Sequence, residues 1–438
     1  MLNVLYFIAS FFIATAYAVA APNIVLIIAD DLGYADVSYN GGDIQTPNID
    51  FLAQNGIELE NFYVEPVCTQ TRAALLSGRY PFRYDLDFRV IKPDTDAALP
   101  VDELIFPEAL KAIGYYTALI GKWHLGSYRE SYLPTSRGFD YHYGNYCGWV
   151  DYYSHVRKRH FKQSKNSKTE WFRNNQMVRE CGYTTELLTS EAIETISSHN
   201  SKTPLFLQVA YTAPHAPLKA PPSYLKRVSY IENNTRRELA AVVTALDDGV
   251  GEIIRALEEN KMLQDTLLIF ISDNGGKIEH GSNNGPYRGE KKDFYEGGVK
   301  VPAVIYWQNK FDHRNITENL HVVDLYPTIL KLASAPNINQ KMLDGIDFSE
   351  ILLNPSATLG REYLFYGNTQ KSAAIRTKKF KLVHDYNTDQ VTLYNLETDP
   401  TESIDLSEQY PDFTDKLFEK LTEYIPTLPE SAEVRADK

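Results

Sequence analysis

The chain is poor in cysteine and carries no excess of positive charge. Its 438 residues include only Cys68, Cys147 and Cys181, too few for a disulfide-dense scaffold. Lysine and arginine total 44 against 57 acidic residues, which gives a formal net charge of -13. This balance argues against nucleic acid as a general partner.

Long hydrophobic runs are also scarce. Residues 1–20 form an apolar run that ends in Ala18-Val19-Ala20, a spacing of small residues that suits signal-peptidase cleavage. A membrane anchor is the alternative, because the run approaches spanning length and lacks a basic start. Since a strand-like segment begins almost at once, we predict a signal peptide over 1–20, no stable membrane span, and a lysosomal or extracellular protein of the secretory pathway. The glycosylation sequons at Asn233 and Asn315 are consistent with that compartment.

The three cysteines pose a pairing question in a secreted chain. If Cys147 and Cys181 form a disulfide across the polar segment between them, Cys68 is left unpaired. We state this pairing as a hypothesis, and the unpaired Cys68 then calls for an explanation.

Apolar runs and helical patterns alternate through most of the chain. Strands are predicted at 22–29, 57–59, 116–120, 204–210, 266–271 and 301–307, and helices at 47–56, 105–113 and 239–257. This alternation predicts an α/β sandwich with a largely parallel sheet, whose functional groups gather at the carboxyl ends of the strands.

The pattern changes after about Leu332. Short strand-like segments at 363–366, 373–376, 380–384 and 391–396 precede an amphipathic stretch at 411–425. We therefore predict a domain over 21–335 and a smaller one over 336–438, built from an antiparallel sheet and a terminal helix.

Oxygen-bearing side chains follow two of the predicted buried strands. Asp30 and Asp31 come after the first, and Asp273 and Asn274 come after the strand that ends at Ile271. Either pair alone is more often a helix cap or a turn. Together at neighbouring strand ends, three carboxylates and a carboxamide suit a hard cation such as Ca²⁺ or Mg²⁺.

Basic side chains follow other strands. Lys122 and His124 lie between Gly121 and Gly126, which permit a turn, and His215 stands between two prolines. Lys291 lies in a glycine-bounded segment before the strand at 301–307. A single loop histidine or lysine is usually plain surface, but the accumulation at strand ends indicates an anion site.

A cysteine and an arginine share one predicted turn. Cys68 and Arg72 precede a helical segment at 73–76 that stops at Gly78. Helix-terminal N–H groups and the guanidinium both favour an anion there. The alternative is a small buried cysteine that only packs.

These segments, taken in order, resemble the motifs of the type I sulfatases, which belong to the alkaline phosphatase superfamily. The matching elements are Asp30-Asp31 with Gly33-Tyr34, 68–83, 121–126, Ala213-Pro214-His215, 273–276, Lys291 before 296–298, and the C-terminal 393–396 and 399–402. Among the members, the chain looks most like the arylsulfatase B group, which removes sulfate from N-acetylgalactosamine. The resemblance implies an alkaline-phosphatase-like fold: a large mixed, mostly parallel sheet sandwiched by helices, with a smaller C-terminal sheet and helix.

The resemblance also implies a mechanism for a sulfuric ester hydrolase. Cys68 would be oxidised by a formylglycine-generating enzyme to Cα-formylglycine, whose hydrate attacks sulfur and later releases sulfate by elimination. Asp30, Asp31, Asp273 and Asn274, together with the modified Cys68, would bind one Ca²⁺. Arg72 and Lys122 would hold the modified residue, His124 would assist proton transfer, and His215 and Lys291 would hold the sulfate of an aryl or glycan substrate.

One position departs from the family signal, which reads Cys-x-Pro-Ser-Arg or Cys-x-Ala-x-Arg. Here Thr71 stands in place of serine and keeps its hydroxyl. Gln70 stands in place of proline, so a residue of fixed φ is replaced by one with a bulky polar side chain. Two alternatives stay open: a non-catalytic protein that binds sulfated glycans, and a superfamily phosphoesterase that uses Thr69 or Thr71. The two-metal phosphatases need more ligands than this set offers.

A basic run stands out in this acidic chain. It extends from Arg157 through Lys168 to Arg173. A solvated loop is the plainer interpretation. The functional one is a surface that draws in a polyanionic sulfated glycan.

Overall fold

The computed structural model describes residues 21–87, 90–157, 168–368 and 371–425. Residues 1–20, which carry the predicted signal peptide, lie outside this range. Within it, no helix has both the length and the apolar character that a membrane span requires.

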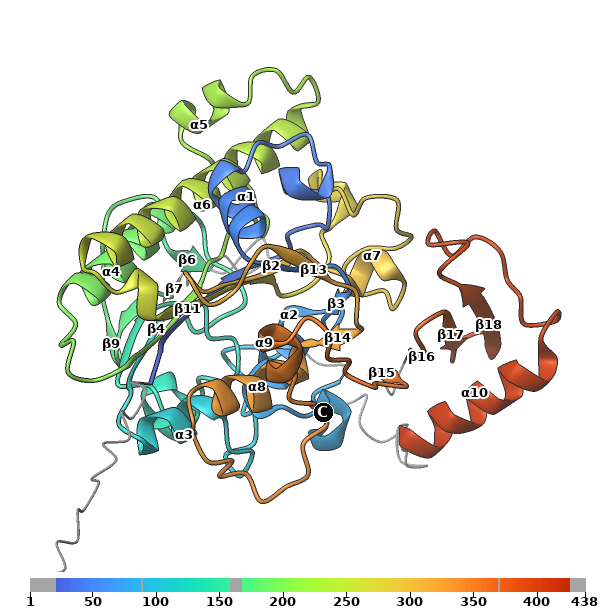
Figure 1. Ribbon diagram of the computed structural model, residues 1–438. Coiled ribbons are helices and arrows are strands. Elements are labelled where there is room, and N and C mark those ends of the chain that lie inside the picture. The colour runs from blue at the N-terminus through green and yellow to red at the C-terminus, as the bar shows by residue number, and fades with distance from the viewer. Residues whose placement is uncertain (1–20, 88–89, 158–167, 369–370, 426–438) are drawn as a thin grey trace, which may run out of the picture.

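A ten-stranded mixed sheet forms the centre of the molecule (Figure 1). Its strands, in spatial order, are β13 (Arg314–Ile316), β2 (Ile57–Leu59), β12 (Ala303–Tyr306), β11 (Thr266–Ser272), β1 (Asn23–Ala29), β10 (Leu205–Ala210), β4 (Tyr116–Gly121), β5 (Tyr141–Gly144), β8 (Phe172–Arg173) and β9 (Gln176–Met177). The central run from β11 to β5 is parallel, whereas β12, β8 and β9 pair antiparallel with their neighbours.

Two hydrophobic cores cover the two faces of this sheet. Even-numbered residues of β1, such as Leu26, face one core, and odd-numbered residues, such as Val25, face the other. This explains the continuous apolar run, since a strand buried on both faces needs no polar side. One core is closed by α1 (Pro47–Asn55), α4 (Thr184–Ser197) and α6 (Asn234–Glu259), beside α5 (Pro222–Arg227). The other is closed by α2 (Cys68–Ser77), α3 (Phe106–Ala112), α8 (Leu325–Leu332) and α9 (Ser349–Leu353).

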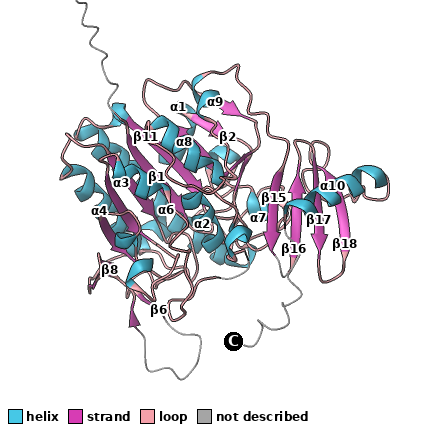
Figure 2. Cartoon of the chain, turned by 90° about the horizontal axis from the view of Figure 1, so that it is seen from below, coloured by secondary structure: helices cyan, strands magenta, loops and turns pink. Residues whose placement is uncertain are grey.

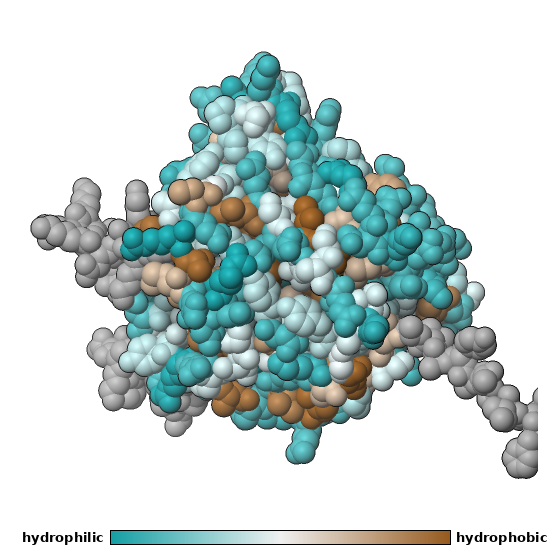
Figure 3. All heavy atoms as spheres, turned by 90° about the vertical axis from the view of Figure 1, so that its left-hand side faces the viewer, coloured by the Kyte–Doolittle hydropathy of each residue, from teal (hydrophilic) through white to brown (hydrophobic). Residues whose placement is uncertain are grey.

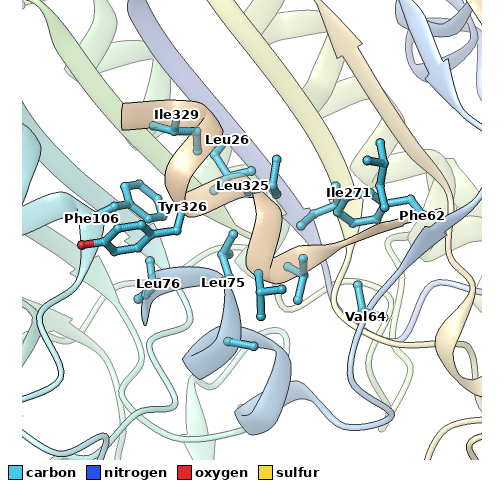
Figure 4. Packing of buried hydrophobic residues seen from close by; sticks show 14 of the residues in the cluster. Leu26, Phe62, Val64, Leu75, Leu76, Phe106, Ile271, Leu325, Tyr326 and Ile329 are labelled. Atoms are coloured by element: carbon cyan, nitrogen blue, oxygen red, sulfur yellow. The ribbon is translucent and has the colours of Figure 1, made fainter. Parts of the chain in front are cut away.

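The second core fixes helix α2 against the sheet. Leu75 and Leu76 of α2 lie beside Leu325 and Tyr326 of α8, under Leu26 of β1 (Figure 4). The residues of α2 on the N-terminal side of Leu75, including Cys68, are buried as well. Packing of the apolar half of α2 therefore places its N-terminus.

A four-stranded antiparallel sheet lies at one side of the main body (Figure 2). It consists of β15 (Leu364–Asn368), β16 (Ser372–Arg376), β17 (Phe380–Asp385) and β18 (Gln390–Asn395), with α10 (Pro411–Tyr424) packed on it. This sheet and helix, together with the large mixed sheet, confirm the predicted fold. The division at 335 stays a prediction.

Short elements complete the chain. Two small sheets pair β3 (Phe62–Tyr63) with β14 (Leu320–His321), and β6 (Val156–Arg157) with β7 (Lys168–Thr169). The helix α7 (Glu296–Val299) precedes β12. Single 3-10 turns occur at Ser38–Asn40, Pro81–Tyr84, Glu130–Tyr132, Pro134–Ser136, Leu263–Asp265, Ile278–His280 and Val322–Asp324.

The surface shown in Figure 3 is mostly hydrophilic, and its apolar residues are scattered among polar ones. Scattered apolar residues are normal on folded proteins. This face therefore gives no sign of a large apolar docking surface.

The predicted disulfide between Cys147 and Cys181 is wrong, because all three cysteines are free thiols. Cys147 is buried and its thiol donates to the carbonyl of Trp149 at 3.0 Å, whereas Cys181 is exposed. One sulfur thus points into the core while the other lies at the surface.

Candidate active site

The predicted oxygen ligands meet because two strands are in register. β1 and β11 pair from Asn23 with Thr266 to Ala29 with Ser272, so Asp30 and Asp273 follow equivalent positions. The Asp31 N–H donates to Asp273 Oδ1 at 3.2 Å. Asp30, Asp31, Asp273 and Asn274 are all buried. The structure therefore brings the four predicted oxygen ligands together at the carboxyl edge of the parallel strands.

Asp31 is surrounded by hydrogen-bond donors. Lys291 Nζ lies 2.5 and 2.8 Å from its two carboxylate oxygens, and Asn274 Nδ2 donates to Oδ1 at 2.7 Å. His215 Nε2 lies 3.6 Å from Oδ2. Burial would raise the pKa of Asp31, but Lys291 and His215 outweigh it and hold this pKa below its usual range. Burial acts to lower the pKa of Lys291, but Asp31, Cys68 and Asp30 together raise this pKa above its usual range. Asp31 and Lys291 therefore both carry charge.

Lys122 reaches Asp30 from the end of β4. Its Nζ lies 2.6 Å from Asp30 Oδ2, and both side chains are fully buried. Gly121 just before it has φ +111°, and a Cβ there would lie 1.9 Å from the carbonyl of Ala210, so only glycine fits. His124 has φ +61°. The turn expected between the bracketing glycines is therefore present.

Cys68 is the first residue of α2, which therefore begins well before the helical segment predicted at 73–76. Its Sγ lies 3.3 Å from His124 Nδ1. The hydroxyl of Thr69 also lies 3.3 Å from His124 Nε2. The first turn of α2 thus presents a thiol and a hydroxyl to one imidazole, with the helix N–H groups behind them.

Arg72 contacts a carboxylate and a backbone carbonyl. Its Nε and Nη2 donate to Asp273 Oδ2 at 3.1 and 2.8 Å, and its Nη1 donates to the carbonyl of Lys122 at 2.9 Å. This buried fork ties two strand ends, those of β11 and β4, to α2. In this structure Arg72 orients Asp273 and the Lys122 turn.

Burial sets the protonation of the groups around Cys68. It raises the pKa of the Cys68 thiol, and Lys122 and Lys291 only partly offset this. It also lowers the pKa of His124 well below its ordinary value, reinforced by Lys122 and Arg72. His215 has a pKa of about 4, again through burial, although Asp31 acts in the opposite direction. Both imidazoles are therefore neutral near pH 7 and able to accept a proton.

The oxygen cluster fits a hard cation. Asp30 Oδ1 and Asn274 Oδ1 are buried and accept no hydrogen bond within the described ranges. One ligand atom from each of Asp30, Cys68 and Asp273 lies within 4.8 Å of the others. Burial, followed by the neighbouring Asp30, raises the pKa of Asp273 to about 6. Crowded carboxylates with unmatched oxygens are what a bound Ca²⁺ would relieve.

Two residues that support the histidines were missed by the sequence analysis. A Cβ at Gly148 would lie 2.7 Å from His124 Cε1, so Gly148 lets the chain pack on the imidazole. The Tyr152 hydroxyl donates to the carbonyl of His215 at 3.0 Å. No motif marks either residue, because each acts only through a contact made by the folded loop.

The basic run lies mostly outside the described residues, which omit 158–167. Of its described members, Arg173 forms an ion pair with Glu191 at 2.5 Å and another with Glu180 at 3.4 Å. Arg173 is therefore engaged with carboxylates of its own chain, and the glycan-attracting role of the run stays a prediction.

Comparisons with known proteins show the family of the chain. Residues 22–335 match the Sulfatase family, and residues 287–427 match "N-sulphoglucosamine sulphohydrolase, C-terminal". Arylsulfatase J of Mus musculus is 32% identical over 93% of this chain and 76% of that protein. N-acetylgalactosamine-6-sulfatase of Mus musculus is 31% identical over 82% of this chain and 72% of that protein.

Solved structures give the same result. The crystal structure of Ps i-CgsB in complex with k-i-k-neocarrahexaose has a TM-score of 0.86 and 31% identity, and the match covers 94% of this chain and 96% of that one. The PsFucS1 sulfatase from Pseudoalteromonas sp. has a TM-score of 0.78 and 25% identity, over 93% of this chain and 92% of that one. The fold places the chain in the class of alkaline-phosphatase-like α/β proteins. Within that class, the chain belongs to the sulfatase family.

Proposed function

We propose that the protein is a calcium-dependent sulfuric ester hydrolase that acts on sulfated glycans through a formylglycine derived from Cys68. The observation that carries this proposal is the meeting of one thiol, three carboxylates and three cations at one buried sheet edge. The carboxylates are Asp30, Asp31 and Asp273, and the cations are Arg72, Lys122 and Lys291. Such a balanced set becomes net positive when a divalent cation binds, which suits an anionic ester.

The protein side chains have distinct tasks in this proposal. Asp30, Asp31, Asp273 and Asn274 would hold the calcium ion, and Arg72 keeps Asp273 in place. Bound calcium would supply positive charge to an oxygen at position 68 and to the sulfate. Formylglycine at position 68 would supply, as its hydrate, the nucleophilic oxygen that a buried, protonated thiol lacks.

In this proposal, His124, His215 and Lys291 act on the nucleophile and on the sulfate ester. His124, 3.3 Å from Cys68 Sγ, is placed to take a proton from a group at position 68. Lys291 and His215 converge on Asp31 with partly accessible side chains, 11% and 18% exposed. They can therefore contact a sulfate that enters from solvent and neutralise charge on the departing oxygen.

Glycan substrates are supported by the relatives rather than by the site. N-acetylgalactosamine-6-sulfatase is named for a sugar sulfate, and Ps i-CgsB was crystallised with k-i-k-neocarrahexaose. The finer resemblance to the arylsulfatase B group stays a prediction. So do the lysosomal or extracellular location and the need for a formylglycine-generating enzyme.

Mass spectrometry of the tryptic peptide that contains Cys68 tests the proposal. The protein would be secreted from a eukaryotic host, and an aldehyde mass at Cys68 together with turnover of an aryl sulfate is the expected result. An aryl phosphate measured in parallel addresses the phosphoesterase alternative, which predicts the opposite preference.

A Cys68→Ala variant should lose turnover by about a thousandfold or more, because the nucleophile is removed.

A sulfated-glycan-binding protein without catalysis is the second candidate, and Gln70 is the observation that favours it. Gln70 is buried at the third position of α2, in the first turn, where proline is also tolerated. Because helix geometry tolerates both residues in a first turn, the departure bears on recognition by the converting enzyme. A free thiol at Cys68 throughout, with sulfated-glycan binding intact, would support this candidate.

A further inference from the structure

A buried glutamate of the C-terminal part contacts both ends of the loop that carries Lys291. Glu402 follows β18 within the 399–402 segment and is 0% exposed. Its Oε2 accepts a hydrogen bond from the Glu296 N–H at 2.7 Å, and its carbonyl accepts one from Arg288 Nη1 at 2.8 Å. Lys291 lies between these two attachment points.

The loop from 288 to 296 is closed on itself as well. The Gly297 N–H donates to the carbonyl of Arg288 at 2.7 Å. Within the loop, the Lys292 N–H donates to the carbonyl of Pro66, two residues before Cys68, at 2.9 Å. A shift of either end would therefore move the backbone that aims Lys291 at Asp31.

Glu402 is itself fixed by a buried ion network. Lys381 Nζ of β17 lies 3.1 Å from Glu402 Oε1 and 3.0 Å from Glu296 Oε1. The Tyr63 hydroxyl donates to Glu296 Oε2 at 2.7 Å. Buried charges of this kind have few alternative arrangements, since any separation leaves one of them unpaired.

The same network reaches the metal ligands. The Gly275 N–H, directly after Asn274, donates to the carbonyl of Gly298 in α7 at 3.0 Å. Glu402 holds the first residue of α7, and the end of α7 supports the turn that follows Asp273 and Asn274. One side chain, that of Glu402 after the small sheet, thus bears on two parts of the candidate active site.

We propose that Glu402 is a positioning residue for Lys291, which fixes the 288–296 loop so that the Lys291 ammonium meets the sulfate of a bound ester. The importance of this for catalysis rests on the proposed function. That Glu402 fixes the 288–296 loop does not depend on the proposed function, and it can be measured without turnover.

The experiment compares three variants of the full chain. Glu402→Ala removes the carboxylate, and Glu402→Gln keeps an acceptor for the Glu296 N–H. Leu417→Ala is the control, because Leu417 is a buried α10 residue whose loss loosens the same small sheet without touching the 288–296 loop. Hydrogen exchange of peptides from 288–296, affinity for inorganic sulfate, and kcat and KM for an aryl sulfate are measured below the lowest unfolding temperature.

We expect Glu402→Ala to speed exchange in the loop, to weaken sulfate binding, and to lower kcat/KM on the order of ten- to a hundredfold, as for a misplaced catalytic group. Glu402→Gln should recover part of each change. Leu417→Ala should lower the unfolding temperature while loop exchange and sulfate affinity stay within about twofold of wild type.

Two results would overturn the proposal: unchanged loop exchange and sulfate affinity in Glu402→Ala, or equal changes in Leu417→Ala. A wild-type protein without sulfatase turnover would instead contradict the proposed function. Exchange and sulfate affinity would still decide the role of Glu402 in that case.

Discussion

Two buried ionic networks in this chain differ in what they leave unmatched. At the sheet edge, Asp30 Oδ1 and Asn274 Oδ1 accept no hydrogen bond from the part of the chain that the structure describes. Beneath the small sheet, both carboxylate oxygens of Glu296 have partners, Tyr63 on one and Lys381 on the other. Glu402 Oε1 accepts no hydrogen bond there either, but it lies 3.1 Å from the Lys381 ammonium, which serves as its countercharge. Burial of charge alone therefore does not identify a site, whereas buried oxygens without partners point to a missing cation.

The networks also differ in access to solvent. Lys291 and His215 keep 11% and 18% of their side chains exposed, whereas the side chains of Lys381 and Glu402 are 0% exposed. A substrate can therefore reach Lys291 and His215, whereas Lys381 and Glu402 have no side-chain contact with solvent. This contrast yields predictions that separate a ligand site from a structural one.

The largest effect is expected from removing one lysine of each network. Lys381→Met leaves Glu296 and Glu402 without their shared countercharge and should cost about 3–5 kcal/mol of unfolding free energy. Lys122→Met removes the cation that offsets the repulsion between Asp30 and Asp31, and it should also destabilise the fold. Urea unfolding measures both.

Calcium distinguishes the two variants. In Lys122→Met, the Asp30 carboxylate has lost its countercharge but still belongs to the proposed calcium site. Added Ca²⁺ should therefore recover much of the stability that this variant loses. It should recover none in Lys381→Met, because Glu296 and Glu402 lie outside the proposed calcium ligands. Equal recovery in both variants, or in neither, would contradict the distinction between the networks.

A smaller effect is expected from calcium on the wild-type protein. At a free concentration of one hundred times Kd, a ligand that binds only the folded state adds about 2.7 kcal/mol. Thermal unfolding with Ca²⁺ and with a chelator measures this gain. Asp273→Asn should abolish most of it.

Asp324→Asn is the matched control for that experiment. Asp324 is also a buried aspartate paired with an arginine, Arg361, but it lies outside the proposed calcium ligands. Its baseline stability should fall while the calcium gain persists. A gain lost equally in both variants would mean that calcium acts through general stability rather than through Asp273.

Much of the fold and the members of the site could be predicted because they are encoded locally. The apolar run of β1 and the periodic face of α6 occur where expected, and the ligands follow strand ends. The helix α4 was not predicted, since its sequence TTELLTSEAIETIS is rich in Thr and Ser, which are weak helix formers. The helix α8 was also missed, because it begins directly after a 3-10 turn and includes Pro327.

Pairings within the site could not be predicted, because they depend on long-range register. Arg72 contacts Asp273 across 201 positions, and Lys122 contacts Asp30 across 92. The sequence shows which charges are present but not which carboxylate each cation meets. The error over Cys147 and Cys181 has the same origin, since spacing alone does not show that one sulfur lies in the core.

The smallest effect concerns a buried carboxylate that belongs to neither network. Asp247 of α6 accepts hydrogen bonds from the Asn48 N–H, the Asn48 side-chain amide and the Ile49 N–H at the start of α1. Burial raises its pKa to about 6, although these donors act in the opposite direction. It shows what happens when a carboxylate is buried against N–H dipoles instead of against an ammonium or guanidinium group.

The sign of the resulting pH effect follows from this raised pKa. Above about pH 6 the folded protein bears the cost of a buried anion, and as the pH falls through 6 the carboxyl takes up a proton that the unfolded chain does not bind. Wild type should therefore gain about 1.4 kcal/mol relative to Asp247→Asn between about pH 7 and about pH 5. Asp248→Asn removes the same charge from the adjacent position. The stability of wild type relative to Asp248→Asn should show no such gain over this pH range. A difference between wild type and Asp247→Asn that stays constant with pH would mean that Asp247 is ionised at pH 5. N–H donors alone would then replace the cations that keep Asp31 ionised.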